Sequence, residues 1–148
     1  MFQDLSTALL MDGYHVRFRA PGQSMSPTIR DGEVVLVAPV RAEEVRRGDI
    51  VLYRASERRC VIAHRVVCVE RGKGQARSFI LRGDASVTCD APIEASQILG
   101  RVAAVERDGR TIRLVGRRAR LRRKMKSAGA QFKNLVVFTL SSKVFLRN

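Results

Sequence analysis

Short apolar segments separated by turn residues constrain the fold of this chain more than any other feature. Most of these segments are rich in β-branched residues, and dipeptides such as Asp31-Gly32 and Gly48-Asp49 lie between them, which is typical of strands joined by tight turns. No helical segments alternate with them to connect the strands of a parallel sheet. We therefore expect a mainly β domain, an antiparallel sandwich or barrel, with strands at residues 14–20, 34–40, 50–54, 61–69, 78–82, 100–106 and 111–115.

The two ends of the chain differ from this pattern. Apolar residues within 2–10 recur at helical spacing ahead of Gly13, which predicts a short N-terminal helix. The segment 117–148 holds ten of the 28 Lys and Arg residues and none of the 14 Asp and Glu residues, so the rest of the chain has a net charge of only +4. We predict one β domain at 1–116 and a basic, helical C-terminal appendage at 117–148.

The basic appendage suggests a partner that carries negative charge, although a solvated helix without a specific partner has the same composition. Its apolar stretch 135–140 is too short to span a bilayer, but a basic segment beside an apolar one can lie at an anionic membrane surface. The stretch could equally pack on the β domain. Residues 117–126 could bind nucleic acid through phosphate charge alone, which is less favoured because they include no aromatic residue for base stacking.

Residues 1–13 contain neither the basic and apolar regions of a secretion signal nor a membrane span. We therefore expect a cytoplasmic protein, with attachment to the inner membrane surface through 117–148 as an alternative. The cysteines Cys60, Cys68 and Cys89 form no close-spaced ligand pair and leave one unpaired in any disulfide scheme. We expect reduced thiols and neither a metal ion nor another cofactor.

Ser24 is the strongest candidate for a nucleophile. It lies in the segment 21–29, which contains two prolines, a glycine and three hydroxyl residues and is predicted to be a loop. A serine hydroxyl is a weak nucleophile until a nearby base takes its proton, and a rigid loop can hold it against that base. On spacing alone, the segment could also be an ordinary polar loop.

The chain has two histidines that could serve as the base. His15 alternates with arginines on the polar side of the first expected strand and is expected at the surface. His64 lies in the middle of a strand and shares a face with Ile62, Val66 and Cys68. Such a histidine is either a satisfied core residue or a positioned base.

Four motifs, in the same order, resemble those of the signal peptidase I and LexA-type serine peptidases. The first, GQSMSPTI at 22–29 followed by DGEVVLV at 31–37, resembles the motif in which the serine before methionine attacks the peptide. The other three motifs are GDIVLY at 48–53, HRV at 64–66, and RGD at 82–84 with Asp90 after it. Together the matches extend from residue 22 to about residue 102, a little over half of the chain.

The third motif supplies the general base in this family. Bacterial signal peptidases and LexA-type repressors have lysine there, whereas the archaeal and endoplasmic-reticulum signal peptidases have histidine. Because His64 occupies this position and no lysine lies between Ser24 and Lys73, the resemblance implies a Ser-His pair. It also implies that Asp90 is the third member of a triad and that Asp84 has a supporting role, although turn chemistry alone is an alternative for Asp84.

The oxyanion-binding groups depart from the family pattern. Many relatives have a serine two residues before the nucleophile whose hydroxyl stabilises the oxyanion, and Gly22 stands there in this chain. We expect the backbone N–H of Ser24 to donate to the oxyanion, with Gln23 as a further candidate. Typical signal peptidases also have an N-terminal membrane span, which 1–13 does not provide, so ordinary removal of secretory signals is not expected.

The resemblance implies a serine endopeptidase whose partner is a peptide or protein substrate. Such an enzyme would bind an extended peptide as an added strand and select small residues near the scissile bond. One alternative is a nucleic-acid- or membrane-binding regulatory protein that retains the peptidase fold. Another is an inactive scaffold, and the sequence predicts no oligomeric state.

Overall fold

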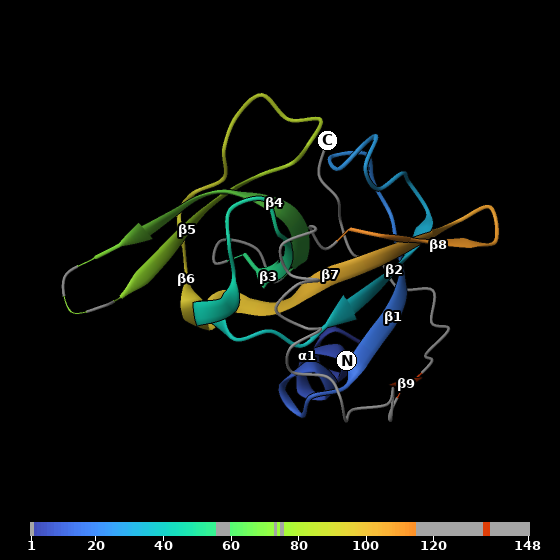
Figure 1. Ribbon diagram of the computed structural model, residues 1–148, viewed down its shortest axis with the longest axis horizontal. Helices are drawn as coiled ribbons and strands as arrows, with labels where there is room; N and C mark the ends of the chain where they lie inside the picture. Colours follow the sequence, from blue (N-terminus) through green and yellow to red (C-terminus); the bar gives the residue numbers. More distant parts are fainter. Residues whose placement is uncertain (1, 56–59, 73, 75, 115–134, 137–148) are drawn as a thin grey trace, which may run out of the picture.

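The computed structural model describes residues 2–55, 60–72, 74, 76–114 and 135–136 (Figure 1). In this part of the chain, helix α1 (Phe2–Met11) precedes a sheet of nine strands. Two short 3₁₀ helices, η1 (Ala42–Glu44) and η3 (Ala95–Gln97), lie in the connections. The strands are β1 (His15–Ala20), β2 (Glu33–Ala38), β3 (Ile50–Arg54), β4 (Val61–Arg71), β5 (Arg77–Arg82), β6 (Ile93–Glu94), β7 (Ile98–Arg107), β8 (Arg110–Arg113) and β9 (Leu135–Val136).

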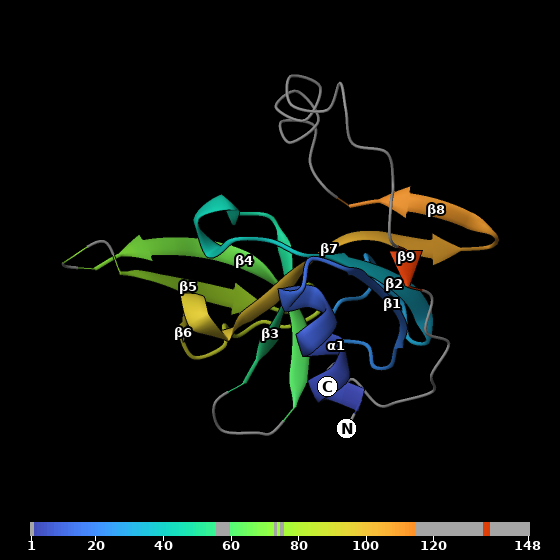
Figure 2. The ribbon, with the colours of Figure 1, turned by 90° about the horizontal axis from the view of Figure 1, so that it is seen from below.

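The strands form a single curled sheet, a half-barrel (Figure 2). Their order is β6-β5-β4-β3-β7-β2-β1-β9, and β8 pairs with β7. The pairs are antiparallel apart from β1 and β9, which run parallel. The predicted class, mainly antiparallel β with a short N-terminal helix, is confirmed, and the sheet is curled on itself rather than divided into a two-sheet sandwich.

Strand β3 is buried on both faces, which explains its unbroken apolar run. Ile50 and Leu52 contribute to one core cluster with side chains from β1 and β2, while Val51 and Tyr53 contribute to a second with side chains from β4 and β5. Successive side chains of a strand point to opposite faces, so a strand between two clusters must be apolar at every position. Each of these fully buried side chains is worth about 1.5–3 kcal/mol.

Strand β4 places His64 on the face of the second cluster. Ile62 and Val66 are buried on the same face, as the alternation predicted. Cys68 is exposed, because the pairing with β5 shifts between Val66 and Cys68. The expectation that Cys68 shares the buried face is therefore wrong, since a bulge reverses the inward and outward alternation beyond it.

Helix α1 and the short strand β9 both contact β1. Helix α1 ends ahead of Gly13, whose positive φ of 87° suits the end of a helix. Leu135–Val136 pair in parallel with His15–Val16 on β1, and contact of 117–148 with a membrane surface stays a prediction. The rest of 117–148 and the boundary at 116 lie outside the described residues, so the helical appendage remains a prediction. Among the described residues, no helix is long and apolar enough to cross a membrane.

Candidate active site

Ser24 lies in the loop between β1 and β2, which is anchored in the core by two buried apolar residues that follow the serine. Met25 and Ile29 are completely buried in the first core cluster, and Ser24 itself is only 3% exposed. The backbone forms successive turns, in which the Ser26 N–H donates to the Gln23 carbonyl and the Ile29 N–H to the Met25 carbonyl, both at 2.9 Å. The two apolar anchors therefore hold the serine on a rigid segment, as its surrounding proline and glycine predicted.

Ser24, His64 and Asp90 form one chain of hydrogen bonds. Ser24 Oγ lies 3.0 Å from His64 Nε2, and His64 Nδ1 lies 2.5 Å from Asp90 Oδ2. A carboxylate only accepts hydrogen bonds, so Nδ1 carries the imidazole proton and Nε2 is left to accept from the serine hydroxyl. The structure thus brings together three predicted residues from a loop, from β4 and from the connection between β5 and β6.

Asp90 is held by two further hydrogen bonds. Its backbone N–H donates to the Leu81 carbonyl at 2.8 Å, and the Tyr53 hydroxyl donates to its Oδ2 at 3.1 Å. Tyr53 is buried, and its ring centroid lies 6.3 Å from that of His64. Sequence reasoning placed Tyr53 in a motif without a role, although the alternation along β3 and β4 puts it on the same face as His64.

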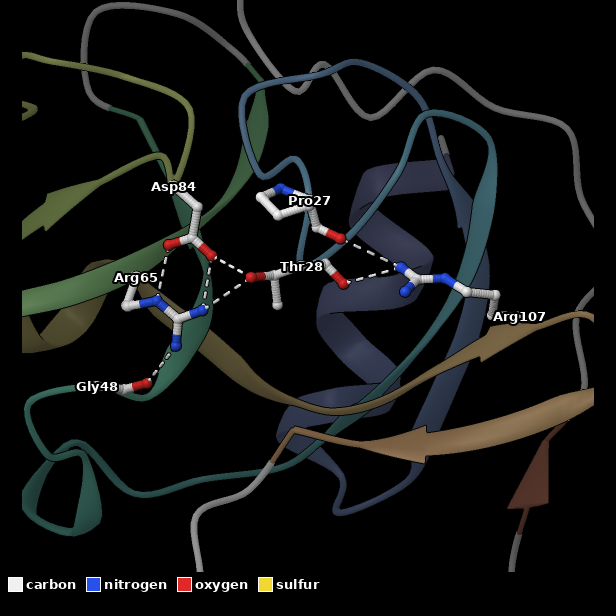
Figure 3. A network of polar contacts seen from close by, with 6 residues as sticks. All are labelled: Pro27, Thr28, Gly48, Arg65, Asp84 and Arg107. Carbon is white, nitrogen blue, oxygen red and sulfur yellow. Dashed lines mark hydrogen bonds and ion pairs between the residues drawn. The ribbon is translucent and has the colours of Figure 1, made fainter.

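Asp84 joins the base strand to the nucleophile loop (Figure 3), and among the described residues its side-chain hydrogen bonds go to Arg65 and Thr28 rather than to the imidazole. It accepts hydrogen bonds from Arg65 Nε and Nη2 at 2.7 and 2.6 Å, and from Thr28 Oγ1 at 2.5 Å. Arg65 follows His64 in β4 and also donates to the Gly48 carbonyl at 2.9 Å. These contacts are compatible with the supporting role expected for Asp84.

The Asp84–Arg65 pair stays ionised at neutral pH. Burial alone would raise the pKa of the Asp84 carboxyl, but the hydrogen bonds from Arg65 and Thr28 together outweigh it and lower the pKa. The hydrogen bond to Asp84 raises the pKa of Arg65 in turn. The link between the loop and β4 is therefore a charged one, whose hydrogen bonds are stronger than those between neutral groups.

Arg107 of β7 holds the opposite side of the same loop (Figure 3). Its Nη2 donates to the carbonyls of Pro27 and Thr28 at 3.3 and 3.2 Å. Both its Nε and its Nη2 bind the Glu33 carboxylate, the latter at 2.9 Å. The hydrogen bond from Arg107 is the main cause that lowers the pKa of Glu33. Arg107 was not a predicted site residue, and no local pattern in the sequence marks it.

Gly83 leaves no room for a side chain beside Ser24 and His64. A Cβ at this position would lie 2.6 Å from the Ser24 carbonyl oxygen, 2.8 Å from Ser86 Oγ and 3.1 Å from His64 Nε2. The Ala85 N–H, two residues further on, donates to the Ser24 carbonyl at 2.8 Å. The glycine between Arg and Asp in the fourth motif therefore allows this backbone to approach the nucleophile loop closely.

The predicted oxyanion-binding groups lie at the start of the nucleophile turn. Gln23 is exposed and Ser24 is buried directly after it. The Gly22 N–H donates to Asp31 Oδ1 at 2.6 Å, so it is already engaged. The Ser24 N–H and Gln23 stay predictions for this role. Among the described residues, no group of three His, Cys, Asp or Glu side chains is placed to hold a metal ion.

The curled antiparallel sheet and the Ser24–His64 hydrogen bond are compatible with a peptidase-like β domain. The family model described as Peptidase S24-like matches residues 4–75, just under half of the chain. The match supports membership of the S24/LexA-type serine peptidase superfamily, and it includes Ser24 and His64 but ends before Asp90. Comparisons with curated proteins and with solved structures gave no match. The assignment to the histidine branch stays a prediction.

Proposed function

We propose that the protein is a serine endopeptidase in which Ser24 is the nucleophile, His64 the general base and Asp90 the group that orients the base. The order of the hydrogen bonds carries this proposal: Nε2 is 3.0 Å from the serine hydroxyl and Nδ1 is 2.5 Å from the carboxylate. This is the arrangement by which a Ser-His-Asp triad activates its serine. A histidine with a purely structural role would not require a buried serine at one nitrogen and a carboxylate at the other.

In this mechanism, His64 Nε2 takes the Ser24 proton as the hydroxyl oxygen attacks the peptide carbonyl carbon. The imidazolium that forms donates its Nδ1–H to the Asp90 carboxylate, so its positive charge develops beside a negative one. His64 Nε2 then gives the proton taken from Ser24 to the leaving amine. The same nitrogen activates a water molecule, which hydrolyses the acyl-enzyme. We assign the backbone N–H of Ser24 to the oxyanion, with Gln23 as a second donor.

The proposed substrate is an extended peptide segment of a protein. An extended segment can add to the edge of a sheet through main-chain hydrogen bonds, with alternate side chains directed to the enzyme. The family resemblance implies that small side chains are selected next to the scissile bond. Ser24 and His64 are each only 3% exposed, so little of either residue is in contact with water in the free protein.

The test is cleavage of a library of extended peptides, with small residues at varied positions, by purified proteins. Ser24→Ala and His64→Ala should each lower kcat by about 10⁴-fold or more, and Asp90→Asn by a comparable factor. Ser26→Ala is the matched control, because Ser26 lies in the same loop, whereas the serine that is hydrogen-bonded to His64 is Ser24.

Cleavage that survives Ser24→Ala would refute the assignment of the nucleophile. Equal loss of activity in Ser26→Ala and Ser24→Ala would mean that the loop tolerates no change, and it would remove the support for a specific role of Ser24. If every variant folds and no protein cleaves any peptide, the inactive scaffold is favoured instead.

A further inference from the structure

A hollow lined by arginines opens beside the nucleophile loop. Its volume is about 600 Å³, and its walls come from β1, the start of β2 and the hairpin of β7 and β8. Figure 1 shows that these elements lie at the opposite end of the sheet from the hairpin of β4 and β5. Five arginines and three acidic residues line this arginine hollow.

Two of the arginines are neutralised by glutamates within the hollow. Arg17 binds the Glu106 carboxylate through Nε at 2.9 Å and Nη2 at 2.6 Å, and Arg107 binds Glu33 in the same bidentate manner. The hydrogen bond from each arginine is the main cause that lowers the pKa of its glutamate. Both glutamates are therefore ionised at neutral pH, and the two pairs together add no net charge.

The other three arginines, Arg19, Arg30 and Arg110, are exposed. In the part of the chain that the structure describes, none of them forms an ion pair with a carboxylate, and Arg19 donates to the Gly32 carbonyl at 2.5 Å. Asp108 is the remaining acidic residue of the lining, which leaves the hollow with a net charge of +2. Because a guanidinium binds carboxylates and phosphates in a bidentate manner, the hollow complements a ligand with two negative charges.

The hollow is continuous with the loop that carries Ser24. Arg30 and Gly32 belong to this loop, and Arg107 lines the hollow while its Nη2 donates to the Thr28 carbonyl at 3.2 Å. A peptide that reaches the hollow from Ser24 would run along this loop to Arg30. A nucleic acid fits less well, since its successive phosphates require an extended basic surface, whereas this lining also includes three carboxylates.

We propose that the arginine hollow binds an acidic segment of the peptide substrate, with two Asp or Glu side chains outside the residues next to the scissile bond. This inference rests on the proposed peptidase function and narrows its substrate class. Ion pairs at exposed sites are individually weak, so two of them should favour an acidic over an uncharged segment by about 5- to 10-fold in affinity.

The test measures binding to the full chain carrying Ser24→Ala, which cannot consume the peptide. The probes are alanine-rich extended peptides in which a pair of glutamates, or a matched pair of glutamines, is moved along the sequence. The protein contains no tryptophan, so a tryptophan in the peptide reports binding by fluorescence without a charged dye. In at least one position the glutamate peptide should bind about 5- to 10-fold more tightly, and this preference should decrease as salt screens the charges.

Reversing the charge of arginines in the hollow tests whether the preference for glutamate peptides arises there. The double variant Arg30→Glu with Arg110→Glu should abolish or invert it. Arg41→Glu with Arg71→Glu is the matched control, because both residues are exposed, lie outside the hollow and undergo the same change of charge; this control should keep the preference. Thermal unfolding verifies that both double variants fold.

Equal binding of glutamate and glutamine peptides at every position, or a preference that survives reversal of Arg30 and Arg110, would overturn the proposal. Stronger competition by a duplex oligonucleotide than by a glutamate peptide would overturn it in favour of a nucleic-acid site. The outcome is separable from the peptidase function. If the protein prefers glutamate peptides but the unmodified protein cleaves none, the peptidase function is refuted and the acidic-peptide site is kept. If it cleaves glutamine peptides and shows no charge preference, the acidic-peptide site is refuted and the peptidase function is kept.

Discussion

Replacing Gly83 with alanine is the smallest change that should disable the site without removing any of its functional groups. The added Cβ would lie 2.6 Å from the Ser24 carbonyl oxygen and 3.1 Å from His64 Nε2. Ordinary contacts of a Cβ begin at about 3.4 Å, so the backbone of Gly83 and that of Ser24 must separate by roughly 0.8 Å. The Ser86 hydroxyl, at 2.8 Å, can rotate away, but the Ser24 carbonyl oxygen belongs to the backbone and cannot.

A separation of this size should act on the chemistry more than on the fold. It would lengthen the 2.8 Å hydrogen bond from the Ala85 N–H to the Ser24 carbonyl and draw Ser24 Oγ away from its position 3.0 Å from His64 Nε2. A misplacement of about 1 Å in a catalytic constellation costs about 100-fold in rate. We therefore expect kcat to decrease by about 30- to 100-fold, while overpacking lowers the free energy of unfolding by about 1–3 kcal/mol.

The assay compares the cleavage rate with the labelling of Ser24 by a fluorophosphonate, which reports activation of the hydroxyl without a requirement for substrate binding. Gly72→Ala is the matched control, because the nearest atom to its new Cβ would be the Ala76 carbonyl oxygen at 3.6 Å, an ordinary contact. Both activities should decrease together in Gly83→Ala and remain unchanged in Gly72→Ala. Cleavage within about threefold of the unmodified protein in Gly83→Ala would show that the loop can move without loss of geometry, contrary to this reasoning.

Two further substitutions test the groups that support the triad. Tyr53→Phe removes the hydroxyl that donates to Asp90; the loss of one such bond should lower kcat by about fivefold with little change in KM, and steady-state kinetics would contradict this if KM alone changed. Asp84→Asn deprives Arg65 of its carboxylate and should lower the free energy of unfolding at pH 7 by about 1 kcal/mol, because the pair is partly exposed. Because the pKa of Asp84 is lowered in the folded protein, its contribution is fully present above its ordinary pKa of about 4 and is lost as the pH falls through the lowered value. Urea unfolding at pH 7 and pH 3 should therefore show less acid sensitivity in Asp84→Asn than in the unmodified protein, and equal sensitivity would exclude this origin.

The strands that could be predicted are those whose own residues determine their burial. The run at 50–54 is bounded by turn residues and is apolar at successive positions, and β3 has the predicted bounds, Ile50–Arg54. Strands β6 (Ile93–Glu94) and β9 (Leu135–Val136) were not predicted, because two residues cannot display an alternation. Their existence depends on partners far along the chain, such as His15–Val16 for β9.

The same distinction applies to the candidate site. Ser24, His64 and Asp90 were predicted through motifs that resemble a known family, and the structure brings these three residues together. The contacts of Tyr53 with Asp90 and of Arg107 with the nucleophile loop join residues 37 and 79–80 positions apart. Such contacts follow from the register of β3 on β4 and of β7 on β2, which the alternation of a single strand does not determine.

Packing rather than charge accounts for most of the rigidity of the nucleophile loop. Truncation of a fully buried Met or Ile to alanine costs about 2–5 kcal/mol, and Met25 and Ile29, which flank the turn after Ser24, are both completely buried. The ion pairs on either side of the loop are partly exposed, and such pairs contribute about 1 kcal/mol or less each. Folding of the core therefore determines where the serine backbone lies, and the arginines adjust its orientation. Because these anchors belong to the core itself, the Ser24–His64 geometry should form together with the fold and should not require a bound peptide.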